Sequence, residues 1–166
     1  MRKPFHTFIQ GNPECQNNVF YTGVLNAPMK KLLLKNVEDL LERMKGTSAP
    51  YEEAFETSVH LLNSLNDFAT EKKTSGTPKV LFQLKKDTAA CHLQMGVPLD
   101  STESDYIKNH LMESKDANEK KTSASVPAAI EQLIFQMKRN ENFSWKIEKQ
   151  KDNSWFLTAQ ISISHE

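Results

Sequence analysis

Cys91 and His92 are the first residues whose types could carry out a reaction. A cysteine nucleophile needs an imidazole within hydrogen-bond reach to hold its thiolate. The two residues are neighbours in a segment with strand periodicity, so their side chains point to opposite faces and His92 cannot activate Cys91. Three other histidines could supply the base: His6, His60 and His110. We interpret Cys91 as a small buried hydrophobe, because Leu93 and Met95 follow it at alternate positions.

No metal or cofactor site is predicted. A structural zinc site uses about four ligands in local pairs such as C-x2-C or H-x3-H. The candidate ligands here are scattered and form no such pair: Cys15, Cys91, His6, His60, His92, His110 and His165. The phosphate-binding, dinucleotide-binding, nucleophile-elbow and metalloprotease motifs do not occur. We therefore expect neither a metal ion nor a cofactor.

Trp145 and Trp155 suggest a different chemistry, the stacking of RNA bases among nearby lysines and arginines. Both tryptophans are in phase with the aliphatic residues of their strands, however, and this favours a cross-strand pair in the core. The whole chain of 166 residues carries 21 basic and 21 acidic residues. This balance argues against binding to nucleic acid, which rests on clustered positive charge.

The expected elements follow from hydrophobic periodicity. A strand at 19–25 precedes a helix that Asn26 caps and Gly46 ends, with a competing start of this helix at Asn36. A second helix begins after Ser48 and forms an antiparallel helical hairpin with the first. Strands at 80–84 and 91–97 form one β-hairpin. Asp100 and Glu103 have the spacing of a capping box for a third helix.

The end of the chain, 123–164, reads as a fourth helix and a second β-hairpin. Ile130, Leu133, Ile134 and Met137 share one face of the helix. Apolar and polar residues then alternate through 143–147 and 155–164. These patterns predict an α+β fold, with an antiparallel sheet of two β-hairpins packed against a helical hairpin and two further helices. We expect a single domain, 1–166, with an irregular N-terminal segment 1–18 and a polar loop 113–125.

The leading functional hypothesis is a non-catalytic protein–protein interaction module: an adaptor, a chaperone-like partner or an inhibitor of another protein. Four apolar residues remain after each element has filled its core face: Leu32, Leu34, Leu81 and Phe156. Exposed together, such residues would form an interface. We expect Leu34, Leu81 and Phe156 to bind a second protein or a second copy of the chain.

Two other classes compete with this hypothesis. One is a small cysteine-dependent hydrolase or transferase that uses Cys91, and the other is an RNA-binding αβ module. No signal peptide or membrane-spanning segment is evident, so we expect a soluble protein of the cytoplasm. The compact, Lys- and Asn-rich chain suggests a bacterial origin, which is compatible with an effector-type protein delivered into a host cell.

Overall fold

The computed structural model describes residues 18–43, 50–72, 78–86, 90–112, 128–139 and 142–164. In chain order its elements are β1 (Asn18–Val24), α1 (Ala27–Glu42), α2 (Pro50–Glu71), β2 (Lys79–Lys86), β3 (Ala90–Leu99), α3 (Ser101–Met112), α4 (Ala128–Arg139), β4 (Phe143–Lys149) and β5 (Trp155–Ser164). The irregular segment 1–18, apart from its last residue, and the polar loop 113–125 lie outside the described residues. So do the helix stop at Gly46 and the cap at Ser48.

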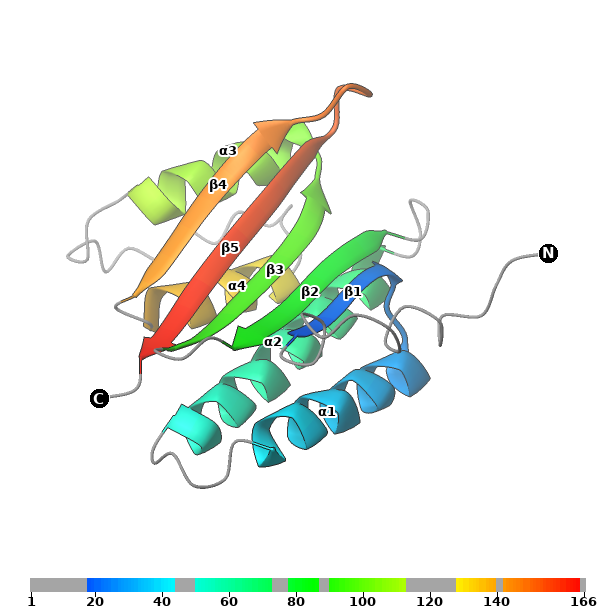
Figure 1. Ribbon diagram of the computed structural model, residues 1–166. Helices are drawn as coiled ribbons and strands as arrows, with labels where there is room; N and C mark the ends of the chain where they lie inside the picture. The colour runs from blue at the N-terminus through cyan, green and yellow to red at the C-terminus, as the bar shows by residue number, and fades with distance from the viewer. Residues whose placement is uncertain are drawn as a thin grey trace.

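The strands form one five-stranded antiparallel sheet in the order β1-β2-β3-β5-β4. Strands β2 and β3 form one of the predicted hairpins, and β4 and β5 form the other. Pairing of β3 with β5 joins the two hairpins at the centre of the sheet (Figure 1). The α+β prediction is confirmed. The predicted sheet lacked β1, which pairs with β2 and forms one edge.

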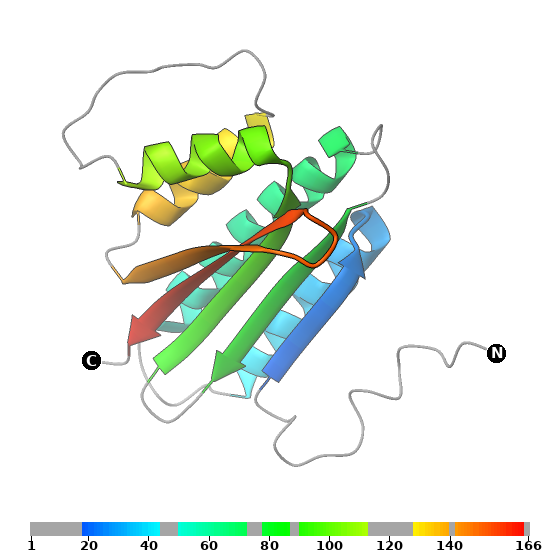
Figure 2. The same ribbon diagram turned by 90° about the horizontal axis from the view of Figure 1, so that it is seen from above.

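The described helices, α1 to α4, all lie on one side of this sheet (Figure 2). Helix α2 packs between α1 and α4, and α3 packs against α4. Helix α1 lies beneath β1, at the edge of the helical layer, and forms the expected helical hairpin with α2. The molecule therefore has two layers, one of helices and one of strands.

Helix α1 begins where the first of the two sequence interpretations places it. The Asn26 side-chain oxygen accepts a hydrogen bond from the backbone N–H of Met29 at 2.9 Å. Pro28 lies in the first turn, where a missing N–H costs nothing. The competing start at Asn36 is wrong, because the residues from Ala27 onward are already helical.

The C-terminal end of α2 connects two other helices. The Glu71 carboxylate accepts a hydrogen bond from the backbone N–H of Ala129, one of the donors at the start of α4 that have no partner within the helix. Lys72 forms an ion pair with Glu103 in the first turn of α3. Asp100 and Glu103 form the predicted capping box, since each side chain accepts the backbone N–H of the other at 2.8–2.9 Å.

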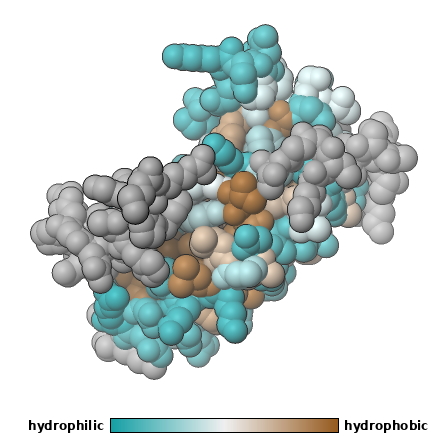
Figure 3. All heavy atoms as spheres, turned by 90° about the vertical axis from the view of Figure 1, so that its right-hand side faces the viewer, coloured by the Kyte–Doolittle hydropathy of each residue, from teal (hydrophilic) through white to brown (hydrophobic). Residues whose placement is uncertain are grey.

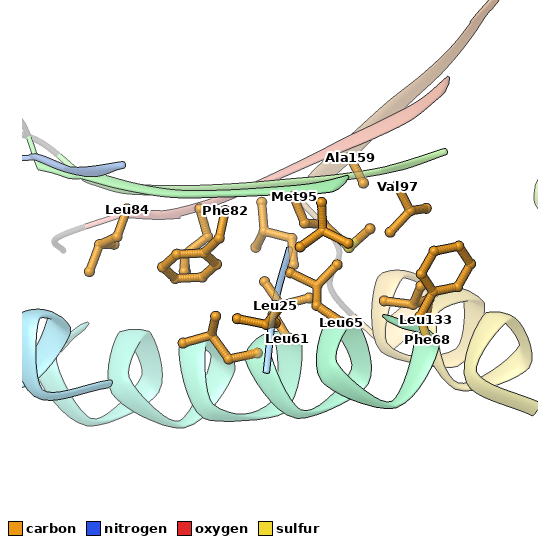
Figure 4. Packing of buried hydrophobic residues seen from close by; sticks show 14 of the residues in the cluster. Leu25, Leu61, Leu65, Phe68, Phe82, Leu84, Met95, Val97, Leu133 and Ala159 are labelled. Atoms are coloured by element: carbon orange, nitrogen blue, oxygen red, sulfur yellow. The ribbon is translucent and has the colours of Figure 1, made fainter. Parts of the chain in front are cut away.

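The core lies between the sheet and the helical layer (Figure 4). Helix α2 contributes Leu61, Leu65 and Phe68, and the strands above it contribute Phe82, Leu84, Met95 and Val97. Ile130, Leu133 and Ile134 of the predicted stripe on α4 are also buried. These apolar side chains lie on one face of each element because the 3.6-residue and two-residue periods place them there.

Candidate interaction surface

The face of the sheet opposite the helices is the candidate surface for a partner. No described helix lies on this face. We call it the open face. It is built from the strand residues whose neighbours in sequence point into the core: Phe20, Thr22, Val24, Leu81, Gln83, Lys85, His92, Gln94, Gly96, Pro98, Ser144, Lys146, Glu148, Phe156, Thr158, Gln160 and Ser162.

The Phe156 ring lies over Gly96 on the open face. A Cβ atom built on Gly96 would approach the Phe156 ring to 2.5 Å and the Leu81 Cβ atom to 3.2 Å. Gly96 therefore leaves the space beside the backbone of β3 that the Phe156 ring occupies. Phe156 and Leu81 are both half-buried. They form a small apolar patch, although they come from strands that are not neighbours in the sheet.

Neutral polar side chains run beside this patch. The strand register aligns Gln83, Gln94 and Gln160 in one row across β2, β3 and β5. The Gln83 side-chain amide donates a hydrogen bond to Asn18 at 3.0 Å. His92 lies 3.0 Å from the hydroxyl of Ser162 in the next row. The centre of the open face can thus make both hydrogen bonds and apolar contacts with a partner.

Charged residues of the open face lie toward its margins. On β4, Lys146 and Glu148 form an exposed ion pair at 3.1 Å, which contributes little to stability because water screens it. Lys85 is also exposed, toward the end of β2. A neutral centre with a charged margin is typical of interfaces between proteins.

Leu34 lies in the other layer of the molecule. It is a half-buried residue of α1 that packs against the core. The structure therefore brings together Leu81 and Phe156, two of the three predicted binding residues, and separates them from Leu34.

Cys91 is completely buried on the core face of β3. His92 points to the open face, as the alternation predicts. His110 lies on α3, where its ring stacks on Tyr106 with centroids 3.9 Å apart and approaches the Tyr106 carbonyl oxygen at 2.8 Å. Burial thus keeps the Cys91 thiol from solvent.

The expected cross-strand tryptophan pair is wrong. Trp145 lies opposite Ala159, and Trp155 lies opposite Lys149. Lys108 of α3 places its ammonium group 4.2 Å from the centroid of the Trp155 ring, and Lys149 lies 5.9 Å from the same centroid. Trp155 thus contacts two lysines at the end of the sheet, where α3 begins to cover it.

Two of the most exposed apolar residues were missed by sequence reasoning. Phe20 and Val24 are 55% and 38% exposed. Their two-residue spacing from Thr22, out of phase with buried Tyr21, could have placed them on the open face. Leu32, which the sequence did single out, is 45% exposed on α1, and Phe135 of α4 is 61% exposed.

No group of three or more His, Cys, Asp or Glu residues that could hold a metal ion occurs within the described ranges. None of the described helices is long and apolar enough to cross a bilayer.

The fold and this surface define a class: a two-layer α+β protein whose antiparallel sheet leaves one face uncovered by described helices. No protein-family model matches the sequence, and no curated protein matches it. Among solved structures the chain is similar to a chain in the crystal structure of the SiaB–SiaC complex from Pseudomonas aeruginosa. The TM-score is 0.60 with 9% sequence identity, and the alignment covers 89% of this chain and 92% of that chain. At this identity the similarity extends to the fold alone.

Proposed function

We propose that this protein is a non-catalytic interaction module that binds another protein through the open face of its sheet. The observation that carries the proposal is the apolar patch of Phe156 and Leu81 over Gly96, flanked by a row of neutral glutamines. An apolar centre bordered by satisfied polar groups is the usual composition of a protein interface. The roles of adaptor, chaperone-like partner and inhibitor are all compatible with such a surface.

The similar structure supports a protein as the partner. That chain was solved within a complex of SiaB with SiaC. A shared two-layer fold gives this chain a sheet and a helical layer that a second protein could bind. The bacterial origin of the similar structure is also compatible with the expected bacterial source of this chain.

The cysteine-enzyme alternative is less well supported by this geometry. Its nucleophile would be Cys91, which is completely buried, while the adjacent His92 interacts with Ser162 on the opposite face. The RNA-binding alternative loses its tryptophan platform, because Trp145 and Trp155 lie in different rows and Trp155 is covered by lysines.

Affinity capture from a lysate of the source organism tests the proposal when it is combined with matched variants. Gln94→Lys places a charge at the centre of the open face, and Leu81→Asp removes half of the apolar patch. Phe135→Asp is the control, because it charges an exposed residue of α4 in the other layer. We expect a captured protein to be reduced about tenfold or more by the first two variants and to be retained by the control.

Melting temperature and far-ultraviolet circular dichroism must show that the variants are folded. Capture that survives both open-face variants, or that the control alone abolishes, would contradict the proposal. A wild-type chain that captures no protein in stoichiometric amount would contradict it too.

A further inference from the structure

The second surface of interest is the side of the molecule at which β1 and α1 lie. We define the β1–α1 edge as strand β1 together with the side of α1 that carries Leu32. Figure 3 shows apolar side chains gathered on this side of the molecule. Three of the four exposed large hydrophobic residues within the described ranges belong to this edge: Phe20, Val24 and Leu32.

Helix geometry places Leu32 at the outer side of the helical layer. Lys30 donates a hydrogen bond to Asn63 of α2 at 3.0 Å, which identifies the side of α1 that faces α2. Each residue advances about 100° around the helix, so Lys30 and Leu32 lie on the two sides of the buried stripe that includes Leu33 and Val37. Leu32 is therefore on the side of α1 that faces away from α2. Since α1 lies beneath the edge strand β1, Leu32 points past the edge of the sheet.

Strand β1 lacks the residue types that usually keep an edge strand from pairing with another strand. Edge strands are usually blunted with charged residues or proline. The sequence of β1, NVFYTGV, contains neither, and no other described strand pairs with its outer side. The opposite edge, β4, follows the usual rule, because Lys146, Glu148 and Lys149 interrupt it. The two edges of the sheet therefore differ in how freely they can accept a new strand.

The charges of α1 run against its own dipole. Acidic residues are favourable near a helix N-terminus and basic residues near a C-terminus. Helix α4 follows this rule, with Glu131 in its first turn and basic residues in its last turn. Helix α1 does the opposite, because Lys30 and Lys31 are near its start and Asp39 and Glu42 near its end.

We propose that the β1–α1 edge binds the same edge of a second copy of this chain, with β1 antiparallel to β1 about a two-fold axis. The continuous sheet would have ten strands. The same axis places the two α1 helices side by side and antiparallel, so that Lys31 near the start of each lies toward Asp39 near the end of the other.

A second copy fits this edge for three physical reasons. An antiparallel strand pair is self-complementary, as a two-fold interface requires. The uncharged β1 brings no like charges together, and the net charge of the chain is zero. Antiparallel α1 helices offset the unfavourable order of charges in each helix. The paired α1 helices of such a dimer would also cover Leu32. A single strand added to β1 would leave Leu32 exposed.

Analytical ultracentrifugation of the full chain tests the proposal. We expect a dimer in the micromolar range for the wild type. Leu32→Glu and Phe20→Glu should each weaken dimerisation about tenfold or more, while Phe135→Glu, which charges the remaining exposed hydrophobic residue, should leave it unchanged. Leu32 is exposed on α1, so circular dichroism should report a folded Leu32→Glu variant even if Phe20→Glu destabilises β1.

Hydrogen exchange locates the interface. Amides of β1 should gain protection as the protein concentration rises, whereas those of β4 should not. A monomeric wild type would overturn the proposal. This holds if the β1 amides exchange freely, and it also holds if residues 1–17 of the same chain protect them at every protein concentration. A dimer that Phe135→Glu disrupts and Leu32→Glu does not would also overturn it. Leu32 lies on α1, away from the open face, so the effect of Leu32→Glu on dimerisation is independent of partner capture.

Discussion

At the scale of single residues, Tyr21 and Gly23 determine the local structure of β1. The Tyr21 hydroxyl donates a hydrogen bond to the Val24 carbonyl oxygen. A Cβ atom on Gly23 would lie 3.0 Å from that hydroxyl, and Gly23 has a φ angle of +152°, which other residues rarely adopt. Glycine at position 23 therefore allows the Tyr21 ring to fold back along the strand and reach its acceptor.

The Tyr21 hydroxyl should make the free energy of unfolding depend on pH in the alkaline range. Burial raises the pKa of Tyr21 above its usual value of 10.0. A raised folded-state pKa means that the stabilisation is complete below about pH 10 and decreases as the pH rises through the folded-state value. Tyr21→Phe should lower the free energy of unfolding by about 1 kcal/mol at neutral pH, because the hydrogen bond is lost.

Urea unfolding at several pH values between 7 and 11 measures both effects. The difference between wild type and Tyr21→Phe should shrink above pH 10, when the wild-type hydroxyl begins to ionise. Tyr106 is a useful internal reference, because burial and the neighbouring Glu131 carboxylate raise its pKa too, and it remains in the variant. A difference that is constant with pH would contradict the assigned role of the Tyr21 hydroxyl.

At the scale of elements, the end of α2 organises the start of α3. Glu103 is only 3% exposed, and its carboxylate accepts from the backbone of Asp100 and pairs with Lys72. Lys72 also lies 3.6 Å from the Asp100 carboxylate. A buried carboxylate that loses its cation is costly, because the remaining charge cannot be solvated.

Lys72→Met should therefore lower the free energy of unfolding by about 2–3 kcal/mol. This loss is at the low end of what breaking a buried ion pair costs, because Lys72 is partly exposed. The double variant Lys72→Met/Glu103→Gln should recover part of that loss. Glutamine keeps the capping-box acceptor without the charge. Chemical denaturation of the two single variants and the double variant gives the coupling energy. Strictly additive effects would show that the pair is not energetically coupled.

At the scale of the whole molecule, the two layers should respond differently to added charge. Leu34 lies in the helical layer against the core, while Phe156 lies on the open face. Leu34→Asp should lower the free energy of unfolding by about 2–3 kcal/mol, since a carboxylate would face apolar neighbours. Phe156→Asp should cost less than about 1.5 kcal/mol, because water can reach the open face.

Thermal and urea unfolding of the two variants distinguish the layers. Equal destabilisation would mean that Phe156 is part of the core after all. If Leu34→Asp were the milder of the two, the assignment of Leu34 to the packed helical layer would be wrong. The dimer inferred at the β1–α1 edge adds a further property at this scale, because it would place two open faces side by side on one sheet.

The local pattern of apolar and polar residues determines most of the helices and strands. The alternation of apolar residues in β2, β3 and β5 and the spacing of Ile130, Leu133 and Ile134 depend only on the pitch of each element, which nearby residues set. The Asn26 cap and the box of Asp100 and Glu103 are also contacts between residues three positions apart. For this reason the sequence alone was sufficient to predict two β-hairpins, a helical hairpin and two further helices.

Only the tertiary structure decided which residues meet across the sheet. The order β1-β2-β3-β5-β4 joins the two hairpins through β3 and β5, a pairing between residues far apart in the chain. It places Phe156 of β5 beside Gly96 of β3, and β1 at an edge. The tryptophans failed to pair because the turn after Lys149 sets a register that puts Lys149 opposite Trp155. Strand order and register depend on long-range pairing and on turn geometry, and neither leaves a periodic signal in the sequence.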